Sequence, residues 1–445
     1  MTSVVGILNR RGVAIAADSA VTRNVRKENL SLEEKVTNNG NKMVRLSDVD
    51  HICILLTGNA DFLGVPWDVI VRRYRQLEGK KHNKTVEDAA KSFFDFIASG
   101  TKYSERFWNE RACGSFLKNI ANAIFDEVIS RMGSENQREN GALKDSELFR
   151  SAFIKNASSI AAEYVNKGHC SQLEAYPITE FRKTASGSLD EFFNDKCLDY
   201  KPEYVRNQFY PKDILEAIRP VFEETLLRVL GSRLDDEMAQ IIDPSTLIFV
   251  GYGQNQDYPS LVSAIVFGGY ASRVNYFISD ITCISDTKPV AICPFAQKDV
   301  IKSILFGISD DWSKDVKNSL NPDLIIEEVF KPYEWEEDPG MDTSQFREEL
   351  DDLFFEFFLK QKTTCKKNYQ DWEKALENYD LEEMASLADS LINLTGFQRI
   401  LTFQQEGVGG LVDLGVISKN EGFTWLRRKS WYHKDAGGKD GRFGV

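Results

Sequence analysis

Two apolar segments separated by a short polar turn open the chain, and they constrain its fold more than any other feature. Residues 4–8 and 13–17 are apolar, apart from Gly6 in the first segment. The four residues between them end in Gly12, which suits a hairpin turn, and so short a connection makes the two strands antiparallel neighbours. We therefore expect a β-hairpin in which Asp18, at the end of the second strand, lies beside the start of the first.

Further strand patterns follow in both halves of the chain. Residues 42–46 and 52–57 flank a polar turn at 47–50 and could form a second hairpin in one sheet, with Gly58 closing the later strand. Residues 246–252 and 260–267 are expected to form a hairpin of a second sheet, which 275–278 and 290–293 extend. The last two predicted strands are 411–417 and 423–426.

Helical periodicity fills the rest of the sequence. Apolar residues recur at intervals of three and four in two long blocks, 67–243 and 297–399. Residues 133–145 and 184–187 are polar or contain Gly and Ser, and are predicted as loops. The tail 434–445 is rich in glycine, and we expect it to be flexible or to dock on a neighbouring subunit. The predicted helical segments are 67–74, 116–132, 149–164, 213–230, 297–306, 346–360 and 381–399.

A threonine follows the first methionine, and its position carries a chemical possibility. If Met1 is removed, Thr2 becomes the N-terminal residue and holds a hydroxyl nucleophile and an amine base on one residue. Such a nucleophile needs no histidine, and the chain has only four. We expect ordinary removal of Met1, rather than autolysis of a propeptide, to expose Thr2.

Five positions in the first 58 residues resemble the β-subunits of the proteasome and of the related bacterial two-component peptidase. These proteins share an N-terminal Thr, an Ala-Ala-Asp-x-x-x-Thr stretch, a strand Lys and a Gly that ends the next strand. The matching positions here are Thr2, Asp18, Thr22, Lys42 and Gly58, and the spacing from Thr to Asp agrees without a gap.

The resemblance implies an N-terminal nucleophile hydrolase fold of the α+β class. This fold is a four-layer αββα sandwich of two antiparallel sheets. Residues 1–445 would then be a single domain, with core strands in 2–60, 246–293 and 408–430. The blocks 67–243 and 297–399 would be helical insertions.

The resemblance also implies roles for individual residues. Thr2 would attack a carbonyl while its amine moves the proton, and Lys42, held by Asp18, would lower the pKa of that amine. The Gly58 N–H would stabilise the oxyanion, and Thr22 would pair with the substrate backbone. The first specificity pocket would be lined by small or apolar residues, which favours an uncharged substrate side chain. These pocket residues are Val21, Gly40, Val44, Leu56 and Ala60.

Two departures from the family pattern concern hydroxyl groups near the nucleophile. Active relatives carry a serine in a Gly-Ser-Gly segment, whereas residues 291–296 here contain none. They also carry an Asp-x-x-Ser-Gly segment, where this chain has 406–410. Glu406 could replace the Asp, but Gly409 has no hydroxyl.

Composition excludes several other classes of function. The net charge of −13 argues against nucleic acid as a partner, and without an apolar run of about 18 residues we expect no membrane segment. Seven cysteines without close pairs are typical of reduced thiols in a cytoplasmic protein. We expect no cofactor or metal, and no phosphate-binding loop is present, so any ATP dependence would come from a partner unfoldase.

Three functions remain open at this point. The chain could be a threonine peptidase that cleaves peptides or unfolded proteins, in a homo-oligomer of the kind its relatives form. It could be an amidase for small molecules that uses the same N-terminal chemistry. It could also be a catalytically inactive scaffold that keeps the fold for interaction.

Overall fold

The structure, a computed structural model, contains α-helices and two five-stranded antiparallel sheets, so the predicted α+β class is confirmed. The chain divides into two compact units, each built around one sheet. Unit 1 comprises Met1–Met43, Asp257–Ser260 and Cys283–Val445, and unit 2 comprises Val44–Gln256 and Leu261–Thr282. The residues described are 3–18, 21–26, 32–37, 41–98, 110–138, 146–167, 177–193, 212–234, 242–270, 273–322, 325–326, 344–401 and 411–428.

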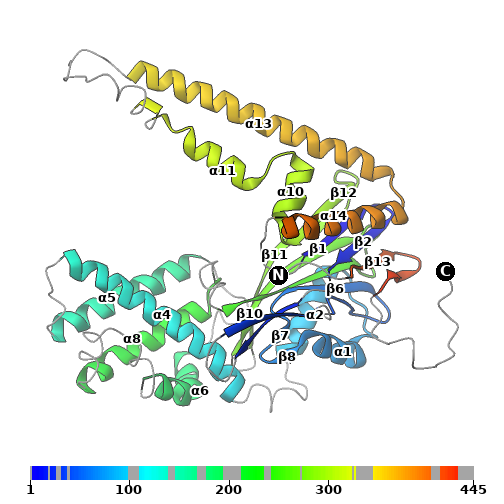
Figure 1. Cartoon of the computed structure of the whole chain (residues 1–445). Helices are drawn as coiled ribbons and strands as arrows, with labels where there is room; N and C mark the ends of the chain where they lie inside the picture. Colours follow the sequence, from blue (N-terminus) through cyan, green and yellow to red (C-terminus); the bar gives the residue numbers. More distant parts are fainter. Residues whose placement is uncertain are drawn as a thin grey trace. The chain divides into compact units, whose positions relative to one another are not determined.

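The sheet of unit 1 is built from both ends of the sequence (Figure 1). Its central strands β1 and β2 form the predicted hairpin, and β12 pairs with the free edge of β1 while β13 pairs with that of β2. Residues 290–293, predicted to extend the second sheet, therefore belong to this one. The order is β12 (Val290–Ala296), β1 (Ser3–Asn9), β2 (Gly12–Ala17), β13 (Asp413–Ser418) and β14 (Gly422–Arg427).

Helix α14 (Leu381–Leu401) covers one face of this sheet. It begins with a capping box, in which the Asp380 and Glu383 side chains each accept a hydrogen bond from the other's backbone N–H, at 2.8 and 2.9 Å. Its apolar face packs on alternate residues of the strands, including Val5 and Ile7 of β1. Since alternate residues share a face, Ser3 faces α14 as well.

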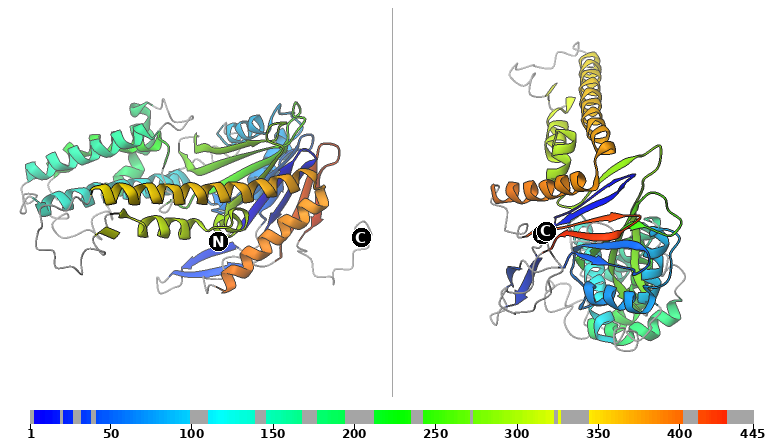
Figure 2. Two further views of the ribbon diagram at one scale, coloured as in Figure 1. Left: turned by 90° about the horizontal axis from the view of Figure 1, so that it is seen from above. Right: turned by 90° about the vertical axis from the view of Figure 1, so that its right-hand side faces the viewer.

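The other helices that the structure describes in unit 1 include α10 (Lys298–Phe306), α11 (Asp310–Ser319) and α13 (Ser344–Asn378). Helix α13 is long and straight and extends beyond the sheet of its unit (Figure 2). Its last turn is tied to the sheet by Asn9, whose side-chain amide donates to the carbonyls of Leu376 and Tyr379 at 3.0 and 2.9 Å. Strands β3 (Val21–Arg26) and β4 (Leu32–Thr37) form a separate two-stranded ribbon.

The sheet of unit 2 holds the second predicted hairpin, so the two hairpins lie in different sheets. Helices α1 (Trp67–Glu78) and α2 (Val86–Ala98) cover one of its faces with an aromatic cluster that includes Trp67, Phe93 and Phe249. The strand order is β11 (Arg273–Cys283), β10 (Ser260–Tyr270), β9 (Ser245–Tyr252), β6 (His51–Gly58) and β5 (Met43–Arg45).

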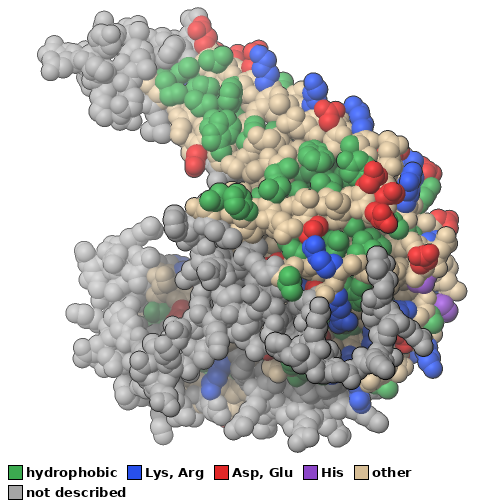
Figure 3. Space-filling view, turned by 45° about the vertical axis from the view of Figure 1, so that its right-hand side comes forward, with side chains coloured by type: hydrophobic (Ala, Val, Ile, Leu, Met, Phe, Trp, Pro, Cys, Tyr) green, Lys and Arg blue, Asp and Glu red, His purple; other side chains and the backbone are tan. Residues whose placement is uncertain are grey.

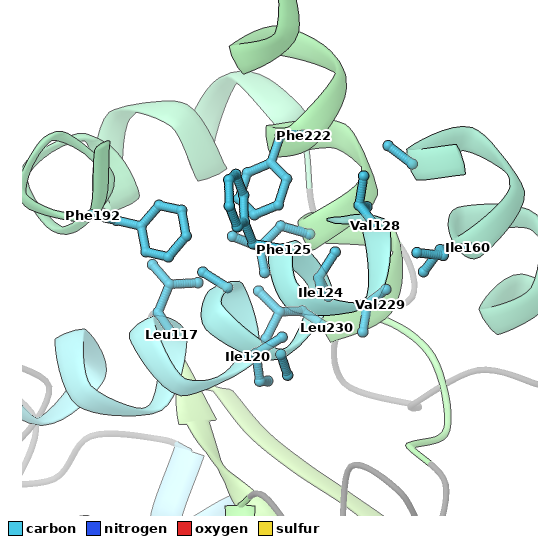
Figure 4. Close-up of a cluster of buried hydrophobic side chains, with 14 of the residues drawn as sticks. Leu117, Ile120, Ile124, Phe125, Val128, Ile160, Phe192, Phe222, Val229 and Leu230 are labelled. Carbon is cyan, nitrogen blue, oxygen red and sulfur yellow. The ribbon is translucent and has the colours of Figure 1, made fainter. Parts of the chain in front are cut away.

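Four further helices in the described residues of unit 2 pack as a bundle around a core of phenylalanines, of which Phe125, Phe192 and Phe222 contact one another (Figure 4). The helices are α4 (Glu110–Arg138), α5 (Ser146–Asn166), α6 (Ile178–Glu191) and α8 (Lys212–Leu230). None of the helices in the described ranges is long and apolar enough to cross a membrane.

Two predicted loops are partly or wholly helical. Residues 133–138 continue α4, and 184–187 lie within α6. In α6 the buried residues Phe181, Ala185 and Leu189 recur every four positions and face the bundle core. This apolar face outweighs the low helix propensity of glycine and serine at its centre, where Gly187 lies on the open side of the helix.

Candidate active site

Asp18 lies directly beside the first described residue of the chain. The hairpin register pairs Val4 with Ala17, and the Asp18 N–H continues this ladder by donating to the Ser3 carbonyl at 3.1 Å. The Ser3 N–H in turn donates to Oδ1 of Asp18 at 2.9 Å. The Asp18 carboxylate is therefore hydrogen-bonded to the peptide group that links residue 3 to Thr2.

Lys42 forms an ion pair with the same carboxylate oxygen. Its Nζ lies 2.5 Å from Oδ1 of Asp18, and the two side chains are only 5% and 1% exposed. Burying both charges has a large desolvation cost, which the attraction between them and the added Ser3 hydrogen bond offset. The Lys42 cation thus lies one carboxylate away from the backbone at the start of β1.

Ser3 adds a feature that no sequence pattern predicts. The residue is fully buried, and its Oγ has no hydrogen-bond partner in the described part of the chain. Leaving a buried hydroxyl unpaired costs about 1–3 kcal/mol, and buried polar groups in native proteins rarely lack a partner. This hydroxyl shares a face of the sheet with Asp18.

A second polar group lies on the other side of β1. Ser3 pairs with Ala296, the last residue of β12, which has a positive φ of 62°. The next residue, Gln297, is buried and accepts a 3.0 Å hydrogen bond from Nε of Arg399, whose Nη2 also bonds both oxygens of Asp299 at 2.6 and 2.7 Å. Sequence reasoning missed this cluster, because Arg399 lies far along the chain from its partners.

Gly58 ends β6 in a conformation that requires glycine. Its φ is +75°, and a Cβ there would lie 2.2 Å from the carbonyl oxygen of Pro244. The turn that follows is held by hydrogen bonds of 2.8 Å from Trp67 Nε1 to Ser245 Oγ and from Ser245 Oγ to the Asn59 carbonyl. The position is thus both restricted to glycine and firmly anchored.

The ladder of β6 indicates where the Gly58 N–H is directed. The Asn59 N–H points toward β9, because it donates to the Pro244 carbonyl at 3.2 Å. Antiparallel pairs alternate between hydrogen-bonded and non-hydrogen-bonded positions, so the N–H of the preceding residue, Gly58, points the other way. On the opposite edge of β6, the Ile52 carbonyl accepts a hydrogen bond from the Leu46 N–H. The backbone N–H and C=O groups of even-numbered residues of β6 therefore point away from β9. Both observations direct the Gly58 N–H away from β9.

Unit 2 contains a pocket of about 460 Å³ that begins directly after Gly58. Two non-glycine residues in its wall, Leu63 and Asp243, have positive φ values of 51° and 52°. Desolvation raises the pKa of the Asp243 carboxyl above its ordinary value. The pocket is lined by Asn59, Asp61, Phe62, Leu63, Gly64, Phe116, Asn119, Ile242, Asp243, Ser245, Val266, Phe267 and Gly268.

The residues predicted to bind substrate do not line this pocket. Val44 is half-buried in β5, Leu56 is buried in β6, and Ala60 is exposed after Gly58. Val21 and Thr22 begin β3, where they pair with Thr37 and Val36 of β4. Gly40, Thr2 and Glu406 lie outside the described residues.

Other nucleophiles and metal sites are less favoured by the described residues. Burial raises the pKa of the Cys53 thiol to about 12, so that it is protonated at neutral pH. Over the described ranges, no group of three His, Cys, Asp or Glu side chains could hold a metal ion.

Comparisons with known proteins leave the site to be interpreted from its own geometry. No protein-family model matches the chain, and no curated protein matches its sequence.

Proposed function

We propose that this protein is a hydrolase of the proteasome β-subunit type, with Thr2 as its N-terminal nucleophile and peptides or unfolded proteins as substrates. The observation that carries the proposal is the buried ion pair of Lys42 with Asp18, whose carboxylate also bonds the Ser3 N–H. Burying a lysine and a carboxylate together has a large desolvation cost, and such buried charges are often found at functional sites.

The proposed reaction follows from these groups. The Thr2 hydroxyl attacks the substrate carbonyl while the Thr2 amine, its pKa lowered by the Lys42 cation, accepts the hydroxyl proton. The amine returns that proton to the leaving nitrogen, and an ester between Thr2 and the acyl group remains. Water then hydrolyses the ester by the reverse proton path, which restores Thr2.

We propose the Gly58 N–H as the oxyanion donor. Its support is the restriction of this position to glycine and the direction of the N–H away from β9. The proposal also includes the finer fold, a four-layer αββα sandwich. It is supported by the observation that each unit provides one five-stranded antiparallel sheet with helices on one face.

A catalytically inactive scaffold is the second candidate function. It is favoured by Ala296, which stands opposite Ser3 and has no hydroxyl with which to orient the N-terminal amine. In an active enzyme, the Ser3 hydroxyl, which has no partner among the described residues, would be an alternative group to orient the N-terminal amine.

Intact mass and covalent labelling of Thr2 test the proposal. The protein is purified without an N-terminal tag and treated with a peptide epoxyketone. The ketone and epoxide carbons of this reagent react with a hydroxyl and a neighbouring amine, which an N-terminal threonine provides. We expect loss of Met1, one adduct per chain at Thr2, and turnover of peptide or small amide substrates. The ratio of the two turnover rates separates a peptidase from an amidase.

Thr2→Ala is expected to abolish labelling and to reduce turnover by a factor on the order of 10³ or more, as removal of a nucleophile does. Thr424→Ala changes an exposed threonine in β14 and serves as the matched control. Turnover that survives in Thr2→Ala would refute the proposal, and absence of labelling and turnover in the wild-type protein would favour the scaffold.

A further inference from the structure

Helix α13 carries an exposed seam of six residues with the spacing of a coiled coil. The positions are separated by four, three, four, three and four residues, which is the a/d repeat of a heptad. All six side chains are exposed, and the two apolar ones, Phe355 and Leu359, are 69% and 53% exposed. The seam consists of Glu348, Asp352, Phe355, Leu359, Lys362 and Lys366.

Hydrophobic side chains gather on this part of the molecule. Figure 3 shows them along the extended part of unit 1, with most of the charged side chains along its outer edge. The helix already has an inner face, in which Phe354, Phe358 and Tyr369 are half-buried. The seam lies on a flank next to this face, so contacts within its own unit do not account for it.

The charge order of the seam is self-complementary. Two acidic residues precede the apolar pair, and two lysines follow it. In an antiparallel pair of α13 helices centred between Phe355 and Leu359, Glu348 faces Lys366 of the second copy and Asp352 faces its Lys362. Phe355 then faces Leu359 of the second copy, so each of the six positions meets a matching one.

The same order is unfavourable for an isolated helix. Glu348 and Asp352 are like charges four residues apart, as are Lys362 and Lys366, and such pairs destabilise a helix. The helix dipole does not explain the lysines, because its effect is confined to the last turn and α13 continues to Asn378. No ion pair joins these four side chains to another residue that the structure describes.

We propose that α13 is a dimerisation helix, which binds α13 of a second copy of this chain in an antiparallel pair along this seam. The pairing is isologous, so one two-fold axis satisfies both copies and the contact closes. A parallel pair would set Glu348 against Glu348, and the charges exclude it. The proposal concerns assembly and is independent of catalysis by Thr2.

Mass measurement in solution tests the proposal directly. Light scattering on the full chain at low salt is expected to give an assembly whose mass halves in the Lys362→Glu/Lys366→Glu variant, whose seam is entirely acidic. Lys360→Glu/Lys367→Glu makes the same charge change on the opposite flank and should leave the mass unchanged. High salt should weaken the wild-type assembly, because the paired charges are exposed.

A mixing experiment tests the register. Glu348→Lys/Asp352→Lys has an entirely basic seam and is also expected to give half the wild-type mass. Mixed in equal amounts with the acidic-seam variant, it should restore the full mass, since every position then faces an opposite charge. A wild-type mass of one chain at all concentrations, an unchanged mass in either seam variant, or no restoration on mixing would overturn the proposal.

Discussion

Asp18 and Lys42 depend on each other, because neither side chain has access to water. Their hydrogen bond is 2.5 Å long, and both are almost completely buried. A buried ion pair of this kind contributes little compared with a well-packed apolar pair, but removing one partner leaves a buried charge that has lost its counterion. The two residues should therefore behave as one energetic unit.

Substitution of Lys42 by Met is expected to lower the free energy of unfolding by about 3 kcal/mol or more. The double variant Asp18→Asn/Lys42→Met should lose less than the sum of the two single variants, since no buried charge remains. Urea denaturation of the four proteins measures this cycle. Lys91→Met breaks an exposed helical pair with Glu87 and should cost no more than about 0.5 kcal/mol. Equal losses in Lys42→Met and Lys91→Met would contradict the coupling.

At the scale of the element, the turn after β6 distinguishes two kinds of glycine requirement. Gly58 and Gly64 both have positive φ values, of 75° and 82°. A Cβ on Gly58 would meet the Pro244 carbonyl, whereas one on Gly64 would meet nothing within 4 Å. Gly58 is thus restricted by contact as well as by conformation.

Gly64→Ala should cost about 1 kcal/mol, the conformational penalty alone. Gly58→Ala should cost at least about 3 kcal/mol, because β6 and the segment before β9 must also separate. Chemical denaturation of both variants measures the difference, and an equal loss would show that the backbone yields freely at Pro244. If Gly58 is the oxyanion donor, turnover should also fall in Gly58→Ala more than in Gly64→Ala.

Elements with a clear apolar period were predictable from the sequence, and elements without one were not. The β1 and β2 hairpin follows from two local apolar segments, and α1 from apolar residues that recur at intervals of three and four. The β3 and β4 ribbon has charged residues at many positions and therefore gives no strand signal. In the candidate site, the contact of Lys42 with Asp18 was predicted only by the resemblance to the proteasome β-subunits. Gln297 and Arg399 meet through tertiary packing, which no local pattern reports.

At the scale of the whole molecule, the two units differ in how their contacts are spread along the chain. The helices of the bundle in unit 2 follow one another between residues 110 and 230. In unit 1, β1 pairs with β12, and β2 pairs with β13 from the far end of the sequence. Contacts between distant residues form slowly, because a long loop must close before they stabilise the chain.

Refolding should therefore protect the bundle of α4, α5, α6 and α8 before the sheet of unit 1. Pulsed hydrogen exchange with mass spectrometry, after dilution from urea, measures the order. We expect amides of α5 and α8 to become protected earlier than those of β1 and β12. Simultaneous protection of all four elements would show that the units fold as one.

The position of β13 has a consequence for chains that are still being synthesised. Until its residues leave the ribosome, β2 has an unpaired edge, and the sequence on that edge is almost entirely apolar. Such an edge is a template for strand addition by other nascent chains. A truncated product that lacks β13 should therefore aggregate or be degraded, rather than persist as a smaller folded protein.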